Sequence, residues 1–145
     1  MNALRLLLLV SALALTGCQV SRTAAADPVE YDLGQTFSLS GGQEAMIRGE
    51  HLRLRFTDVL EDSRCPSQVE CVWTGQARIA VVVEQAGREP TTAEFNTNPA
   101  PGQNAQTAQV GPYTIALTAL DPYPQTPEQS IDLAEYRATL SVRST

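Results

Sequence analysis

Hydrophobic and polar residues alternate along most of the chain after Tyr31, and a period of two is typical of β-strands with one buried face. The alternation is clearest from Leu52 to Phe56, where apolar side chains are separated by arginines. A run of β-branched residues between Gln76 and Glu84 predicts a strand at the middle of a sheet, buried on both faces. Weaker alternation predicts further strands at residues 36–40, 44–47, 93–95, 107–110, 113–119 and 136–142, and a helical turn at 131–134.

Turn-forming residues separate these segments. Gly41-Gly42, residues 96–102 and residues 121–124 are rich in glycine, proline or asparagine, and proline lacks the N–H that a sheet requires. Seven or eight strands at short spacing predict an all-β fold. We expect one domain at residues 31–145, an antiparallel, immunoglobulin-like β-sandwich or a small barrel.

The N-terminal segment has the features of an export signal. Residues 6–15 form an apolar run of ten after a start that contains Arg5, which is too short for a transmembrane helix of about 20 residues but fits a signal peptide. Residues 15–18, Leu-Thr-Gly-Cys, follow directly and resemble the bacterial lipobox. That resemblance implies removal of residues 1–17 and acylation of Cys18. The alternative is a buried cysteine in a first helix.

An acylated Cys18 would anchor the protein to a membrane, with residues 18–30 as a flexible tether. In the sorting rule of such lipoproteins, an aspartate after the cysteine retains the protein at the inner membrane. Gln19 occupies that position here. The resemblance therefore implies an outer-membrane lipoprotein that faces the periplasm, if the host has an outer membrane.

Composition excludes several classes of protein. The ten cationic residues are all arginine, there is no lysine, and His51 is the single histidine. A Walker A loop, a Schiff base, a Ser-Lys dyad and an H-E-x-x-H zinc site are therefore excluded. The net charge of −6 argues against a nucleic-acid partner. No serine lies in a G-x-S-x-G motif, so we name no catalytic residue and expect no cofactor.

Residues 61–75 differ from the rest of the chain because they combine cysteines, charged residues and the single tryptophan. Export implies an oxidising compartment, and two cysteines remain once Cys18 is acylated, so we predict a disulfide between Cys65 and Cys71. Closing a loop of about seven residues stabilises a fold by roughly 2 kcal/mol. The spacing is not the C-x-x-C of thiol oxidoreductases, which disfavours a redox role.

The same segment supplies a candidate binding loop, consisting of Asp62, Arg64, Glu70 and Trp73. For Trp73 we favour packing against the disulfide in the core over a role as a ligand platform. For Asp62 and Arg64 we favour a charge-assisted bond that pins the loop over contact with a ligand. Calcium could bind the nearby carboxylates, but their spacing is not that of an EF-hand and no metal site is predicted; these carboxylates are Asp58, Glu61, Asp62 and Glu70.

A basic strand face is the other candidate surface, and it carries Arg48, His51, Arg53 and Arg55. These side chains could meet lipid phosphates or an acidic partner. Cross-strand pairing with Glu84 or Glu94 explains them equally well. We favour that pairing, because the acidic net charge opposes binding to an anionic surface.

The segment from Leu52 to Gly75 resembles a family of uncharacterised bacterial exported lipoproteins. These proteins share a D-S-R-C-P then C-x-W-x-G pattern after a strand similar to L-R-L-R-F-x-D-V, and Pro112-Tyr113 and residues 120–124 also match them. The resemblance implies an exported all-β domain with an internal disulfide. It implies no particular activity.

Three functions are compatible with these features. The favoured one is a membrane-anchored, non-enzymatic binding or structural module, whose disulfide loop and proline-rich loops contact an envelope protein or polymer. The second is a hydrolase or inhibitor-like domain that acts on envelope polymers with a carboxylate pair assembled by the fold. The third is a calcium-binding module at the acidic loop.

Overall fold

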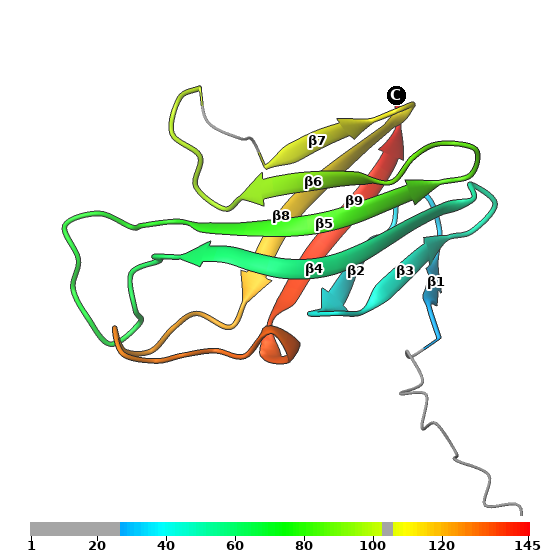
Figure 1. Ribbon diagram of the computed structural model, residues 1–145. Helices are drawn as coiled ribbons and strands as arrows, with labels where there is room; N and C mark the ends of the chain where they lie inside the picture. Colours follow the sequence, from blue (N-terminus) through cyan, green and yellow to red (C-terminus); the bar gives the residue numbers. More distant parts are fainter. Residues whose placement is uncertain (1–26, 103–105) are drawn as a thin grey trace, which may run out of the picture.

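The computed structural model describes residues 27–102 and 106–145 and consists of two β-sheets packed face to face (Figure 1). The predicted signal peptide, Cys18 and most of the predicted tether lie outside the described residues. One sheet has the order β1-β3-β4-β5-β6 and the other β2-β9-β8-β7. The strands are β1 Val29–Tyr31, β2 Thr36–Ser40, β3 Glu44–Ile47, β4 Leu52–Asp62, β5 Ala77–Gln85, β6 Thr91–Asn96, β7 Thr107–Val110, β8 Tyr113–Asp121 and β9 Arg137–Ser144.

The all-β prediction is confirmed, and the two separate sheets make the fold a β-sandwich rather than a small barrel. Neighbouring strands are antiparallel except β1, which pairs in parallel with β3. Alternate residues of both sheets point inward and form one core. On β4, Leu52, Leu54 and Phe56 are fully buried, while Arg53 and Arg55 between them are exposed.

Two strands differ from the sequence-based prediction. β5 lies next to the edge strand β6, and β4 occupies the middle of the sheet. Arg78, Val82 and Glu84 of β5 are only half-buried, because no further layer of described residues covers the outer face of this sheet (Figure 1). β-Branched residues are favoured on half-buried strands as well as on fully buried ones. The composition of β5 therefore does not show that both of its faces are buried.

β1 is the strand that the sequence did not predict. The sequence predicts Val29 and Glu30 as part of the tether, but they pair with Ala45 and Met46 of β3. Three residues are too few to display a period of two. The predicted helical turn is a short 3₁₀ helix, η1, at Leu133–Glu135. No helix among the described residues is long and apolar enough to cross a membrane.

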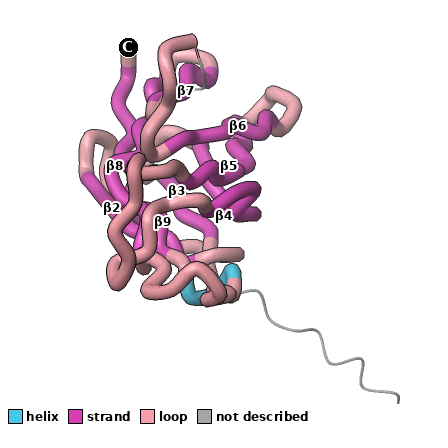
Figure 2. The backbone as a smooth tube through the Cα atoms, turned by 90° about the vertical axis from the view of Figure 1, so that its left-hand side faces the viewer, coloured by secondary structure: helices cyan, strands magenta, loops and turns pink. Residues whose placement is uncertain are grey.

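Three connections gather at one end of the sandwich, which we call the loop end: residues 41–43, 63–76 and 122–136. The backbone N–H of Gly41 donates to the carbonyl of Tyr136 at 3.0 Å, and Ser67 N–H donates to the carbonyl of Pro124 at 2.9 Å. Figure 2 views the molecule from the left of Figure 1 and shows these connections in front of the strands, with η1 at the bottom. The loop end therefore brings together segments that lie far apart in the sequence.

Candidate functional site

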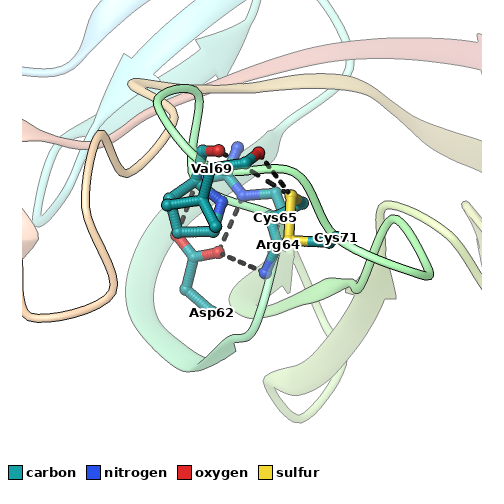
Figure 3. Close-up of a disulfide and its surroundings, with 6 residues drawn as sticks. Asp62, Arg64, Cys65, Val69 and Cys71 are labelled. Carbon is teal, nitrogen blue, oxygen red and sulfur yellow. Dashed lines mark hydrogen bonds and ion pairs between the residues drawn. A yellow bond between two sulfur atoms is a disulfide. The ribbon is translucent and has the colours of Figure 1, made fainter.

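The connection between β4 and β5, residues 63–76, is a closed loop that we call the disulfide loop. Its two arms are joined by backbone hydrogen bonds, from Ser63 N–H to the carbonyl of Gln76 and from Cys65 N–H to the carbonyl of Thr74, both at 2.8 Å. The predicted Cys65–Cys71 disulfide is present, with its Cα atoms 6.0 Å apart (Figure 3). The loop is thus cross-linked both covalently and through its backbone.

Glycine is required where the second arm of the loop returns to the sheet. Gly75 has φ +68°, in the left-handed region that disfavours other residues. A Cβ atom at this position would also collide with the carbonyl of Ser63 on the opposite arm. The close approach of the two arms therefore depends on Gly75.

A buried ion pair holds the base of the disulfide loop. The guanidinium of Arg64 donates to both carboxylate oxygens of Asp62, from Nε to Oδ1 at 2.8 Å and from Nη2 to Oδ2 at 2.6 Å (Figure 3). The Arg64 side chain is 2% exposed and that of Asp62 is 10% exposed. This geometry confirms that Asp62 and Arg64 pin the loop, as the sequence predicted.

Arg64 also ties the loop to the C-terminal end of β8. Its Nη1 donates to the carbonyl of Leu120, and its Nη2 donates to the carbonyl of Pro122 at 2.8 Å. The ring of Tyr123 lies over the guanidinium, with the ring centroid 4.3 Å from Cζ, in the geometry of a cation–π contact. The donors of Arg64 are thus directed to atoms of the protein itself.

Tyr136 completes this network from the segment before β9. Its hydroxyl donates to Asp62 Oδ2 at 2.9 Å. Burial and the bond to the charged Asp62 raise the pKa of Tyr136 to about 12. Burial alone would raise the pKa of Asp62, but the hydrogen bonds and charge of Arg64, with the Tyr136 hydroxyl, outweigh it and hold that pKa below its ordinary value. Asp62 is therefore an ionised structural group.

The outer part of the disulfide loop exposes three large apolar side chains, which we call the apolar tip: Val69, Val72 and Trp73. Their exposed fractions are 42%, 95% and 78%. The prediction that Trp73 packs against the disulfide in the core is wrong. Residues 63–76 form no strand, so the rule that places alternate residues on one face does not apply to Cys71 and Trp73. The chain leaves the sheet at Asp62 and re-enters it at Ala77, and the tip points into solvent.

The structure divides the four residues of the predicted binding loop into two groups. Asp62 and Arg64 lie in the buried network, whereas Glu70 and Trp73 are exposed. The sequence analysis did not include Val69 and Val72 in the binding loop. Val72 lies between Cys71 and Trp73 in a segment without strand periodicity, a pattern that could have indicated an exposed apolar side chain. The surface that the loop presents is therefore mainly apolar.

The carboxylates near the loop do not gather into a metal site. Among the described residues, no three histidine, cysteine, aspartate or glutamate side chains come close enough to hold a metal ion. Glu61 accepts hydrogen bonds from Ser63 Oγ at 2.8 Å and from Gln76 Nε2 at 3.3 Å. Together with the bonds of Asp62, these contacts give Glu61 and Asp62 partners within the protein.

The register places Glu84 of β5 directly opposite Arg53, as predicted, but the arginines of the basic strand face form their ion pairs with other carboxylates. Arg53 and Arg55 both lie 3.5 Å from Glu44, because β3 places Glu44 directly opposite Arg55. Arg48 forms ion pairs with two other carboxylates, Glu30 at 3.3 Å and Asp32 at 2.8 Å. Glu94 instead contacts Arg78 of β5 at 3.0 Å. His51 lies in the turn before β4 and has φ 49°.

No family model, curated protein or solved structure matches the chain. The apolar tip on its pinned loop is the feature that the packing of the fold does not require.

Proposed function

We propose that this protein is a membrane-anchored lipoprotein of the bacterial envelope, attached through acylated Cys18, and that its β-sandwich is a non-enzymatic binding module. The contact surface is the disulfide loop. The observation that carries this proposal is the apolar tip, in which Val72 is 95% exposed and Trp73 is 78% exposed. An outer-membrane location facing the periplasm agrees with Gln19 after the cysteine.

The rigidity of the loop supports a binding role. Binding orders flexible side chains and loops at a cost in entropy, and a surface held in place beforehand avoids part of that cost. The disulfide, the Asp62–Arg64 pair and the close approach at Gly75 hold the disulfide loop. Tryptophan is also among the residue types that contribute most to binding surfaces.

The chemistry around the loop favours binding over catalysis. The Asp62 carboxylate is bonded to Arg64 and Tyr136, and Glu61 is bonded to Ser63 and Gln76. These contacts stabilise both carboxylates as parts of the structure. An envelope protein, polymer or lipid surface is the class of partner that an anchored domain meets.

Mass spectrometry of the protein extracted from membranes tests the anchor. We expect the mass of residues 18–145 plus acyl chains, less two hydrogens for the disulfide. The Cys18→Ser variant should lack the acyl mass. An unmodified Cys18 in the membrane-extracted wild-type protein would contradict the anchor.

Photo-crosslinking in cells tests the contact surface. A photoreactive amino acid in place of Val72 should give crosslinked products with envelope components. The matched control carries it in place of Ala86, an exposed residue in the turn between β5 and β6 at the other end of the sandwich. Equal crosslinking at both positions, or none at Val72, would contradict a binding role for the disulfide loop.

A further inference from the structure

We infer that the apolar tip docks on the surface of the bilayer that holds acylated Cys18, so that zwitterionic phospholipid is the partner of the disulfide loop. This inference rests on the proposed function, because it requires the lipid anchor. It assigns the domain a second contact with the membrane and hence a fixed orientation on it.

The chemistry of the apolar tip fits a membrane interface. Tryptophan is enriched where lipid headgroups meet hydrocarbon, since its ring is apolar and its N–H is polar. Trp73 and its neighbour Val72 are largely exposed, and Val69, between the two bonded cysteines, is partly exposed. These side chains project from a loop rather than line a cleft, whereas small-molecule sites are concave.

The size of the apolar tip also favours a lipid surface over a folded protein. A specific protein–protein interface buries about 800 Å² on each partner. The tip has three large apolar side chains, and even a fully buried tryptophan contributes only about 150–250 Å². Shallow insertion into lipid requires no larger complementary surface, and the anchor keeps the lipid close by.

The chain enters the domain beside one turn of the loop end. Asp27 and Pro28 line a surface hollow together with Gly41, Gly42 and Gln43 of the turn between β2 and β3. That turn belongs to the loop end, as does the disulfide loop. In Figure 1 the disulfide loop lies at the left of the molecule and the start of β1 at its lower right, with the connection between β8 and β9 running along the bottom between them.

The distance from Cys18 to the domain is short. Eight residues separate Cys18 from Asp27, and a fully extended chain of that length spans at most about 30 Å. An anchored Cys18 therefore keeps the entry point of the domain within about 30 Å of the bilayer. The tether therefore holds the whole domain beside the bilayer, where the exposed apolar tip meets lipid as a second point of contact, separate from the entry point.

Charge selects zwitterionic over anionic lipid. The chain has a net charge of −6 and no lysine, and Glu70 is the only charged residue between Cys65 and Trp73. The nearest arginine, Arg64, is buried and bound to Asp62. Anionic headgroups attract clusters of basic residues, which the disulfide loop lacks, so a negative surface should weaken docking.

Trp73 provides the test, because it is the single tryptophan of the chain. The full protein extracted from membranes is reconstituted into phosphatidylcholine vesicles, with or without brominated acyl chains, and flotation of the vesicles verifies anchoring. We expect Trp73 emission at shorter wavelength than in the Cys18→Ser protein in buffer, and quenching by the brominated lipid. Quenching by acrylamide should fall about threefold, since the indole leaves water for the interface.

Two variants separate docking of the tip from a general effect of charge. Val72→Asp places a charge on a side chain that is 95% exposed, so the domain should fold and float while Trp73 returns to the exposed emission. Ala86→Asp adds the same charge in an exposed turn at the other end of the sandwich and should leave Trp73 docked. Vesicles with phosphatidylglycerol should show weaker docking of the wild-type protein.

Each contrary result has a distinct meaning. If the protein floats but acrylamide quenches Trp73 as fully as in the Cys18→Ser protein, docking is overturned while the anchor stands. If the wild-type protein does not float, the anchor itself fails. A shift of emission that requires added envelope proteins, docking that survives Val72→Asp, or tighter docking on phosphatidylglycerol would each overturn zwitterionic lipid as the partner.

Discussion

Replacement of Arg64 by methionine tests the claim that a buried ion pair holds the disulfide loop. Methionine keeps an unbranched side chain of similar length but removes the guanidinium, and with it the side-chain bonds to Asp62, Leu120 and Pro122. Asp62 would keep the Tyr136 hydroxyl and the backbone N–H of residue 64 as donors. The substitution thus leaves a carboxylate largely buried without its counter-charge.

The expected loss of stability follows from this geometry. Removing one partner of a buried ion pair costs about 3–5 kcal/mol, because the other charge stays buried without compensation. The Asp62 side chain is 10% exposed, so water reaches its carboxylate and we expect the lower end, about 3 kcal/mol. That is a large part of the roughly 5–15 kcal/mol that stabilises a typical domain.

Urea unfolding followed by far-ultraviolet circular dichroism measures this loss for Arg64→Met, Asp62→Asn and the double variant. The double variant should be more stable than the sum of the single losses implies, with a coupling free energy of about 2 kcal/mol. The lowered pKa of Asp62 adds a pH signature. Its stabilisation is fully present above the ordinary value of 3.8 and is lost as pH falls through the lowered folded value.

Two results would refute this reasoning. A loss below about 1 kcal/mol for Arg64→Met would match a solvent-exposed pair rather than a buried one. Arg64→Met should destabilise the fold less in strong acid, where Asp62 is protonated. An equal loss of unfolding free energy in strong acid and at neutral pH would show that the guanidinium does not act by compensating the charge of Asp62. Arg64→Lys is the matched control, because it keeps the charge but loses the planar fork, and it should recover only part of the stability.

Three further predictions concern the loop and its surroundings. Because the pKa of Tyr136 is raised from 10.0 to about 12, the fold is fully stabilised below pH 10 and should lose about 2 kcal/mol as pH rises toward 12; urea midpoints of Tyr136→Phe should lack this decline, and an equal decline would contradict the assignment. Gly75→Ala should lower stability by about 2 kcal/mol or more, since it adds a steric collision to the strain of a positive φ, whereas Gly87→Ala, which has open space around it, should cost about 1 kcal/mol in the same thermal melts. Replacing both Cys65 and Cys71 by serine should cost roughly 2 kcal/mol and lower the fluorescence anisotropy of the single tryptophan, while unchanged anisotropy would show that the disulfide does not restrain the tip.

The strands could be predicted because each buries one face. Leu52, Leu54 and Phe56 alternate with exposed residues, and the core requires this pattern. β1 and the outer face of β5 were not predicted correctly. A strand of three residues carries no periodic signal, and β-branched residues do not reveal whether a second layer covers a sheet.

Only the contacts of the candidate site between residues close in sequence could be predicted. Asp62 and Arg64 are two positions apart, so their pairing could be inferred from the sequence. The contacts of Arg64 with Leu120 and of Asp62 with Tyr136 join segments more than fifty positions apart, and only the packing of the two sheets creates them. A strand at residues 71–73 would place Trp73 in the core, but the chain leaves β4 at Asp62, so Trp73 lies outside the sheet.

The disulfide loop inverts the usual distribution of side chains, because charged groups lie at its buried base and apolar groups at its exposed tip. A buried ion pair is seldom more stabilising than well-packed apolar residues of the same volume, so stability alone does not account for Arg64. Its hydrogen bonds to the carbonyls of Leu120 and Pro122 instead fix the loop relative to the end of β8, a specificity that apolar packing alone would not provide. It follows that substitutions at the base should change the free energy of unfolding, whereas substitutions of Val72 should change docking and leave unfolding unaltered.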